Sequence, residues 1–194
     1  MKLNFIYSKN SQNIIGIDNE LLFNNKDDMK HFKNITTNNY NQNHKNIVIM
    51  GYNTWYSIPD KYKPLKGRIN IIISTIHYNE FKNKDDSGIF LVFRTFHDCY
   101  QFLKNAEING NMLGKKFIIG GAQLYNYVFK NYYDNIDHIY ETYFDCPVNM
   151  TKLNKNGKNV SVLDFNIFND DNFIKLKKKY LDESKIDERN KDYI

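Results

Sequence analysis

The sequence predicts an α/β fold, a three-layer αβα sandwich in which helices cover both faces of a mixed, mostly parallel central sheet. Apolar runs alternate with amphipathic segments along most of the 194 residues, a pattern typical of strands connected by helices. Such runs are expected where strands are buried on both faces of a sheet. No internal repeat or interdomain linker is visible, so residues 1–194 are interpreted as one domain.

Six apolar runs are predicted to be the buried strands. The first helix is predicted over residues 27–37, where Asp28, Phe32 and Ile35 follow one another at i, i+4 and i+7 and therefore share one face. The predicted strands are Leu3–Tyr7, Ile47–Met50, Ile69–Ser74, Ile89–Phe93, Phe117–Ile119 and Ile136–Phe144.

Two further helices are indicated later in the chain. Thr95 and Asp98 have the spacing of a capping box, and apolar residues at helical spacing follow them. Residues 122–133 show the same apolar spacing. The polar, Asn- and Lys-rich segment 149–159 is expected to be a loop.

Composition and charge argue against several classes of protein. The net charge of +5 is diffuse, because basic residues at 175–179 are followed by acidic ones at 182–188, so no nucleic-acid-binding face is indicated. Cys99 and Cys146 lie in no disulfide framework, which favours a reducing, cytoplasmic compartment. No run approaches 18 apolar residues and the N-terminal segment is too polar for a signal peptide, so a membrane or secretory role is not predicted.

Several kinds of catalytic site are also a poor fit. The histidines are not paired with one another or with the cysteines at zinc-site spacing, so no metal ligand is predicted. A G-x-S-x-G nucleophile motif is absent from the sequence. Residues 110–115 only partly resemble a P-loop, because the glycine spacing is short and no Ser or Thr follows the lysine.

Two glycine turns indicate a site for a nucleotide. A predicted strand leads into Gly51 and a short helix, and another leads into Gly120 and Gly121 and a helix. Two helix N-termini that face one cleft would offer backbone N–H groups and positive dipole ends to a pyrophosphate. Neither turn is G-x-G-x-x-G, so the ordinary Rossmann fingerprint is not met, and each turn alone is more often a tight-packing device.

A carboxylate and an arginine complete the set of candidate residues. In isolation, Asp28 in a first helical turn would be interpreted as a surface charge that complements the helix dipole. Because Asp28 shares the apolar face with Phe32, a poorly solvated carboxylate with a raised pKa is expected instead. Arg68 stands where the segment 64–70 enters a buried strand.

The order and separation of these segments resemble those of dihydrofolate reductase. The motifs are VIMGYNTWYSIP, PLKGRINIIIS and FIIGGAQLY, and the resemblance runs from about Leu3 to Phe144 and more weakly to the end. It implies an eight-stranded central sheet with an antiparallel C-terminal edge. It also implies reduction of dihydrofolate to tetrahydrofolate, which supports one-carbon metabolism, with NADPH as the hydride donor. Antifolate-type inhibitors are then further ligands, and the protein would be a monomer unless it is fused to or paired with thymidylate synthase.

The resemblance also implies roles for individual residues. Asp28 would hydrogen-bond the pterin ring and favour its protonation, Thr142 would hydrogen-bond that carboxylate, and Arg68 would bind the α-carboxylate of the glutamate tail. The Gly120–Gly121 peptide bond is expected to be cis. The apolar walls around the substrate would be Ile6, Met29, Phe32, Ile58 and Leu65. The cofactor-binding positions would be Ser8, Ile15, Gly51, Tyr52, Asn53, Thr54, Ser74, Thr75, Ile119, Gly120, Gly121, Ala122, Gln123, Leu124 and Tyr125.

The sequence departs from the family pattern at several of these positions. Phe23 stands at a catalytic position where tryptophan is usual, and Leu22 replaces a proline. Lys9 and Asn10 are expected to end the first strand early. Uncharged residues stand where relatives commonly supply basic groups to the adenosine phosphates, which leaves NADPH and NADH open as cofactors. These residues are Tyr52, Asn53, Thr75 and Gln123.

Other interpretations stay open at this point. A degenerate relative that binds folate or a nucleotide without turnover would also fit Phe23 and Ser8, the latter standing where a small apolar residue is usual. The net positive charge is the only observation that favours an RNA-binding role. The chain ends at 192–194, about where a last edge strand should begin, so part of that strand is expected to be missing. The chain is then either shortened or the front of a longer protein, such as a fusion with thymidylate synthase.

Overall fold

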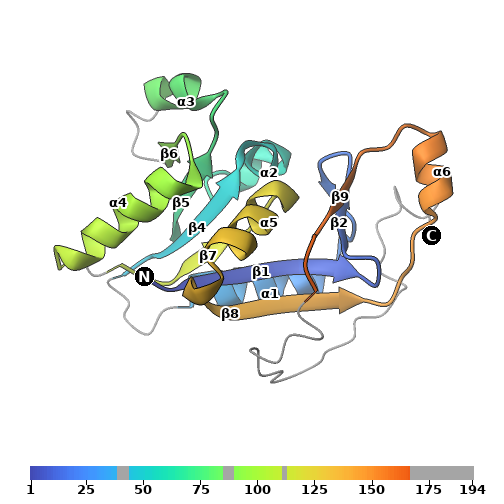
Figure 1. The fold of residues 1–194 in the computed structure, drawn as a ribbon, viewed down its shortest axis with the longest axis horizontal. Coiled ribbons are helices and arrows are strands. Elements are labelled where there is room, and N and C mark those ends of the chain that lie inside the picture. The colour runs from blue at the N-terminus through green and yellow to red at the C-terminus, as the bar shows by residue number, and fades with distance from the viewer. Residues whose placement is uncertain (39–43, 85–89, 111–112, 167–194) are drawn as a thin grey trace.

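The computed structural model describes residues 1–38, 44–84, 90–110 and 113–166. These residues form a six-stranded sheet in the order β6-β5-β4-β7-β1-β8, and each pair of neighbouring strands is parallel (Figure 1). The α/β class and the mostly parallel central sheet are confirmed. The strands are β1 (Leu3–Asn10), β4 (Asn46–Gly51), β5 (Arg68–Ile73), β6 (Leu91–Phe93), β7 (Lys116–Ile118) and β8 (Ile136–Phe144).

Helices cover both faces of this sheet, as the alternating pattern predicts. On one face, apolar residues of β1, β4 and β7 pack with those of α4 and α5. On the other face they pack with residues of α1, α2 and α3. Figure 1 shows α4 and α5 in front of the sheet and α1 behind it. The helices are α1 (Lys26–Thr37), α2 (Tyr52–Ser57), α3 (Tyr78–Lys84), α4 (Phe96–Ile108), α5 (Ala122–Asn131) and α6 (Met150–Lys155), with 3-10 turns at Asp60–Tyr62 and Tyr133–Asn135.

A second, antiparallel sheet lies near the C-terminal end of β1 and was not predicted. Its order is β3-β2-β9, formed by β2 (Ile14–Ile17), β3 (Glu20–Leu21) and β9 (Val160–Val162). It is stabilised by a separate apolar cluster that includes Leu22, Phe23 and Phe144. These strands are too short for their periodicity to be recognised in the sequence.

Two sequence expectations are wrong in detail. Lys9 and Asn10 do not end β1 early, because β8 pairs with the whole strand and Lys9 is buried beside Glu141. The segment 149–159 contains α6, since the side chain of Asn149 accepts a hydrogen bond from the backbone N–H of residue 152 and caps the helix.

Other expectations are met or fall outside the described residues. Thr95 caps α4 by accepting a hydrogen bond from the backbone N–H of Asp98, as the capping box predicts. The strand expected over residues 89–93 is shorter and begins at Leu91. An antiparallel C-terminal edge strand would fall on residues 167–194, which lie outside the described part of the chain.

Two features bear on the class of protein. Cys99 and Cys146 are both buried and free. Among the helices that the structure describes, none is long and apolar enough to cross a membrane.

Candidate active site

The first turn of α1 buries a carboxylate. The helix begins after Asn25, whose side-chain oxygen accepts hydrogen bonds from the backbone N–H groups of Asp27 and Asp28 at 2.9 and 3.1 Å. This cap fixes the first turn so that Asp27 faces solvent and Asp28 points inward, with only 7% of its surface exposed.

Two hydroxyl groups hold the Asp28 carboxylate. Ser8 of β1 and Thr142 of β8 are directly paired in the parallel register, and both side chains hydrogen-bond Asp28. Burial raises the pKa of Asp28 above the usual carboxyl value, and the hydroxyl bonds and the nearby His31 only partly offset this effect. The structure therefore brings together Asp28, Thr142 and Ser8. The hydrogen bond from Ser8 to Asp28 was not predicted, because the two residues lie far apart in the sequence and meet only in the folded chain.

Four of the five predicted apolar walls lie in one apolar cluster, on the sheet face that α1 covers. Ile6, buried on β1, belongs to one apolar cluster with the partly buried Phe32, Ile58 and Leu65. Met29 is exposed and is not part of that cluster.

Arg68 is held in place at the start of β5. Its Nη1 donates to Thr36 Oγ1 at 2.8 Å, its Nε donates to the carbonyl of Lys66 at 3.2 Å, and its guanidinium lies over the ring of Phe32. Among the described residues, no carboxylate lies within ion-pair distance of Arg68. Burial lowers the pKa of Arg68 to about 10, so the group is still cationic at neutral pH.

Thr36 is a functional candidate that the sequence did not reveal. It is fully buried, and its hydroxyl donates to the carbonyl of Phe32 at 2.7 Å, which directs its lone pairs toward Arg68. Its position four residues after Phe32, on the same helix face, is the only sequence signal for this role.

The two glycine turns lie side by side at the carboxyl ends of β4 and β7. The backbone N–H of Gly51 donates to the carbonyl of Gly120 at 2.8 Å. The Gly120–Gly121 peptide bond is cis, as expected. Gly120 has a φ of +131°, and a Cβ there would lie 3.0 Å from Thr54 Oγ1, so only glycine fits.

A family model described as dihydrofolate reductase matches residues 2–184 of the chain. The chain belongs to the dihydrofolate reductase family. Dihydrofolate reductase of Candida albicans is 32% identical over 133 residues, which are 69% of this chain and 62% of that protein. The viral dihydrofolate reductase of Saimiriine herpesvirus 2 is 38% identical over 98 residues, 50% of this chain and 43% of the viral protein.

Two more relatives bear on the fold and on chain organisation. The bifunctional dihydrofolate reductase-thymidylate synthase of Acanthamoeba polyphaga mimivirus is 30% identical over 148 residues, 73% of this chain and 24% of that protein. The solved structure of Schistosoma mansoni dihydrofolate reductase superposes with a TM-score of 0.59 at 32% identity, over 74% of this chain and 73% of that one. The chain thus spans less than two thirds of the first curated relatives that it matches.

The expected cofactor-binding positions continue into the first turn of α5. Ala122 is half-buried, Gln123 is exposed, and Leu124 is buried. Tyr125 is buried as well, and its hydroxyl donates to the carbonyl of Ile6 at 2.7 Å. Burial and the nearby Asp28 raise the pKa of Tyr125. This tyrosine therefore connects the glycine turn with the carboxylate site.

Two isoleucines among the expected cofactor-binding positions, Ile15 and Ile119, pack against opposite faces of the sheet. Ile119 lies against the cluster that contains Ile6, and Ile15 lies against the cluster on the α4 and α5 face. The structure does not bring them into one cluster, so their shared role stays a prediction.

The ends of β5 and β6 carry a histidine and an arginine that the sequence analysis did not single out. Tyr52 stacks on the imidazole of His77 at 3.8 Å between ring centres, and Ser74 Oγ accepts from the backbone N–H of His77. Thr75 donates its hydroxyl to the carbonyl of Arg94 at 3.0 Å. Asn53 is exposed. These contacts depend on neighbouring strand ends, which local spacing does not predict.

Phe23 lies in the apolar cluster of the small sheet. Its ring is almost fully buried and stacks on Phe144 with 3.9 Å between ring centres, and Leu22 packs in the same cluster. This residue thus fills a closed space, whereas a tryptophan is usual at this position in the family.

We expect Phe23→Trp to destabilise the protein by about 1–3 kcal/mol, because an indole cannot enter this stack without displacing its neighbours. Chemical denaturation of both proteins measures the effect. Phe102→Trp is the matched control, since that ring is half-exposed and a larger ring has room there. An unchanged free energy of unfolding for the Phe23 variant would show that the cluster has space for the family's tryptophan.

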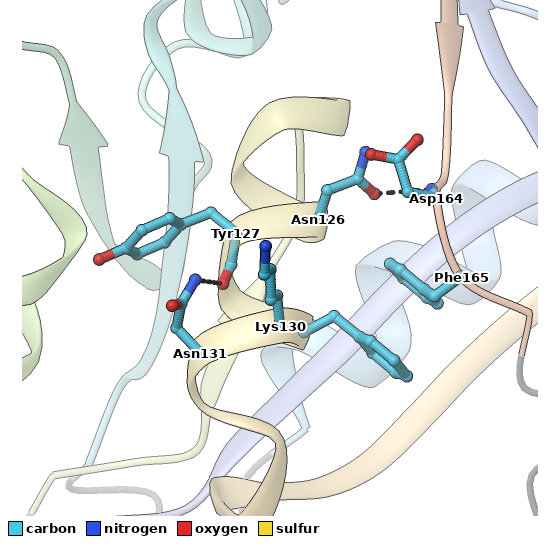
Figure 2. A pocket seen from close by; sticks show the side chains of 7 residues that line it. Asn126, Tyr127, Lys130, Asn131, Asp164 and Phe165 are labelled. Carbon is cyan, nitrogen blue, oxygen red and sulfur yellow. Dashed lines mark hydrogen bonds between the residues drawn. The ribbon is translucent and has the colours of Figure 1, made fainter.

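A separate hollow of about 520 Å³ lies on the outer side of α5 (Figure 2). It is lined by side chains of α5 and by Asp164 and Phe165, and it contains none of the predicted site residues. Within the described residues, no group of three or more His, Cys, Asp or Glu side chains could hold a metal ion.

Proposed function

We propose that this protein reduces 7,8-dihydrofolate to 5,6,7,8-tetrahydrofolate, with the hydride supplied by NADPH. The observation that carries the proposal is the buried Asp28 carboxylate, held by the hydroxyls of Ser8 and Thr142 beside an apolar wall. A carboxylate placed in this way suits a flat, nitrogen-rich ring that offers N–H donors along one edge.

Asp28 has two tasks in this proposal. Its carboxylate accepts hydrogen bonds from the amino group and N3 of the pterin ring and so fixes the ring's orientation. Burial favours the protonated form of this group more than in a free carboxyl group, and a proton is delivered from it toward N5 through water. Ile6 and Phe32 exclude bulk water from the ring.

Arg68 binds the far end of the substrate. The hydroxyl of Thr36 and the ring of Phe32 hold its guanidinium in place before any ligand arrives. A planar guanidinium suits a carboxylate better than an ammonium does, because it can donate two parallel hydrogen bonds. We assign it to the α-carboxylate of the glutamate tail.

The residues at the carboxyl ends of β4 and β7 fit a dinucleotide. Gly51, Gly120 and Gly121 carry no side chain that would screen the backbone from a ligand, and α5 begins after Gly121 with its positive dipole end. When bound, NADPH supplies the hydride. The protein's own contribution is to orient the two reactants, which can supply on the order of 7–11 kcal/mol.

The choice between NADPH and NADH depends on the ends of β5 and β6. Tyr52, Asn53 and Thr75 are uncharged, and the guanidinium of Arg94 and the imidazole of His77 lie nearby. We assign the extra phosphate of NADPH to this side of the site, because these groups can bind an anion.

The test is dihydrofolate-dependent oxidation of NADPH, followed by the loss of the reduced-nicotinamide absorbance and repeated with NADH. Turnover with NADPH, faster than with NADH, is the expected result. Tight binding of a diaminopteridine antifolate without turnover by either cofactor would contradict the proposal and support a relative that only binds folate.

We also propose a cytoplasmic monomer, unless the chain is joined to or paired with thymidylate synthase. The free, buried cysteines fit a reducing compartment, and the mimivirus relative fits the fused arrangement. Size-exclusion chromatography with light scattering measures the mass in solution, and a stable dimer would contradict the monomer.

A further inference from the structure

A buried charge network lies beneath the Asp28 site. Lys9 is only 1% exposed, and its Nζ lies 3.3 Å from Glu141 Oε2. It also donates to Asn13 Oδ1 at 2.8 Å and to Asn166 Oδ1 at 3.4 Å. Tyr7 donates its hydroxyl to the same Glu141 oxygen at 3.0 Å. The three donors of the ammonium group thus have three acceptors.

The strand register places this network directly behind the residues that hold Asp28. Tyr7 pairs with Glu141, Ser8 pairs with Thr142, and Lys9 pairs with Tyr143. Successive side chains of a strand point to opposite faces. Ser8 and Thr142 therefore reach Asp28 on the α1 face, while their neighbours form the network on the α5 face.

The network also fixes the turn that leaves β1. Asn13 has a left-handed backbone with a φ of 59°, its N–H donates to the carbonyl of Asn10, and its carbonyl accepts from Leu163. Through Asn13, the buried ammonium connects β1 and β8 with this turn. Breaking a buried ion pair by removing one partner is costly, whereas an apolar replacement of both partners is often tolerated.

We propose that the Lys9–Glu141 pair, together with Tyr7 and Asn13, is a positioning unit that keeps the hydroxyls of Ser8 and Thr142 on the Asp28 carboxylate. The hydrogen bonds and the ion pair of this network are directional, so they fix how β1 and β8 lie beside each other to within the tolerance of a hydrogen bond. An apolar pair at the same positions would not impose this constraint. The consequence for turnover rests on the proposed function, but the consequence for Asp28 does not.

A distinctive result follows for the titration of Asp28. The hydroxyl bonds from Ser8 and Thr142 lower its pKa against the effect of burial, so loosening them raises that pKa further. The groups that act on Asp28 are His31 on its own helix and Tyr125 on α5. The ionisable groups of the network are Tyr7, Lys9 and Glu141. Removing the ammonium and the carboxylate together leaves the net charge unchanged.

The experiment compares the double variant Lys9→Met/Glu141→Leu with the control Lys116→Met/Glu107→Leu. The control removes another Lys–Glu pair, with a buried lysine on β7 and its partner on α4. Carbon-13 NMR of the side-chain carboxyl measures the pKa of Asp28, and thermal unfolding checks the fold. We expect the pKa to rise only in the first variant. We also expect kcat/KM for dihydrofolate to fall about tenfold there.

An Asp28 pKa equal to that of the wild type in a folded Lys9→Met/Glu141→Leu protein would overturn the proposal, whatever the activity. An equal rise in the control variant would overturn it too, because the effect would then be general. If the double variant does not fold, Tyr7→Phe removes one hydrogen bond and keeps the ring, and a smaller rise is expected. A wild-type protein without turnover would refute the proposed function, and the NMR comparison would still decide this inference.

Discussion

Asp28→Asn is expected to lower kcat/KM for dihydrofolate by about 10²- to 10⁴-fold, the usual contribution of a positioned acid or base. The amide keeps the shape of the side chain and one acceptor for the hydroxyls of Ser8 and Thr142. It removes the negative charge and the exchangeable carboxyl proton. Steady-state kinetics with saturating NADPH measure the change.

The neighbouring carboxylate provides the control for this variant. Asp27 lies in the same helical turn, and its backbone N–H donates to the same capping side chain of Asn25. Its own side chain, however, is exposed. Asp27→Asn is expected to leave kcat/KM within about twofold, because the charge is solvated. Equal losses of kcat/KM in both variants would mean that activity depends on negative charge anywhere in the first turn of α1, and that Asp28 has no special role.

The Asp28→Asn variant also separates an effect on catalysis from an effect on stability. The folded pKa of Asp28 is raised, so this group favours folding at low pH, and that contribution is lost as pH rises through the folded pKa. Above its folded pKa, the ionised and buried carboxylate therefore opposes folding. Asp28→Asn should not lower the Tm at neutral pH, and a large drop would indicate misfolding as the cause of lost activity.

Arg68→Ala is expected to raise KM for dihydrofolate by about 10- to 100-fold, since hydrogen bonds to charged groups contribute roughly 1.5–3 kcal/mol each. KM for NADPH should stay the same, because the assigned role concerns only the glutamate tail. The comparison of the two KM values in one preparation is the measurement.

Two controls make this result specific. Lys66→Ala removes an exposed cation two residues away and should have little effect. A dihydropterin without the glutamate tail should show the same KM with Arg68→Ala as with the wild type. Equal increases for the tailless and the complete substrate would contradict the assignment of Arg68 to the carboxylate.

Local patterns predicted the parts of the molecule that follow from local physics. The helix face shared by Asp28 and Phe32 follows from a spacing of four residues, and the structure buries that carboxylate as expected. The long apolar strands and the cap at Thr95 were recognised for the same reason.

The features that the sequence analysis missed depend on partners distant in the chain. Lys9 was expected to end β1 early, but Glu141 on a neighbouring strand compensates its charge, and a lysine is rarely buried without such a partner. Thr36 gains its role from Arg68, and Tyr52 stacks on His77 across neighbouring strand ends. The short β2, β3 and β9 acquire their pairing only when the chain is folded.

The most direct test of the central claim is the pH dependence of dihydrofolate reduction by the wild type and by Asp28→Asn. Because the reaction needs a proton held by Asp28 and the bound ring together, the wild-type rate should fall as pH rises through an apparent pKa above the usual carboxyl value. The variant should be slow and should lack this dependence. The same falling profile in both proteins would contradict the account, because the proton would then come from another group.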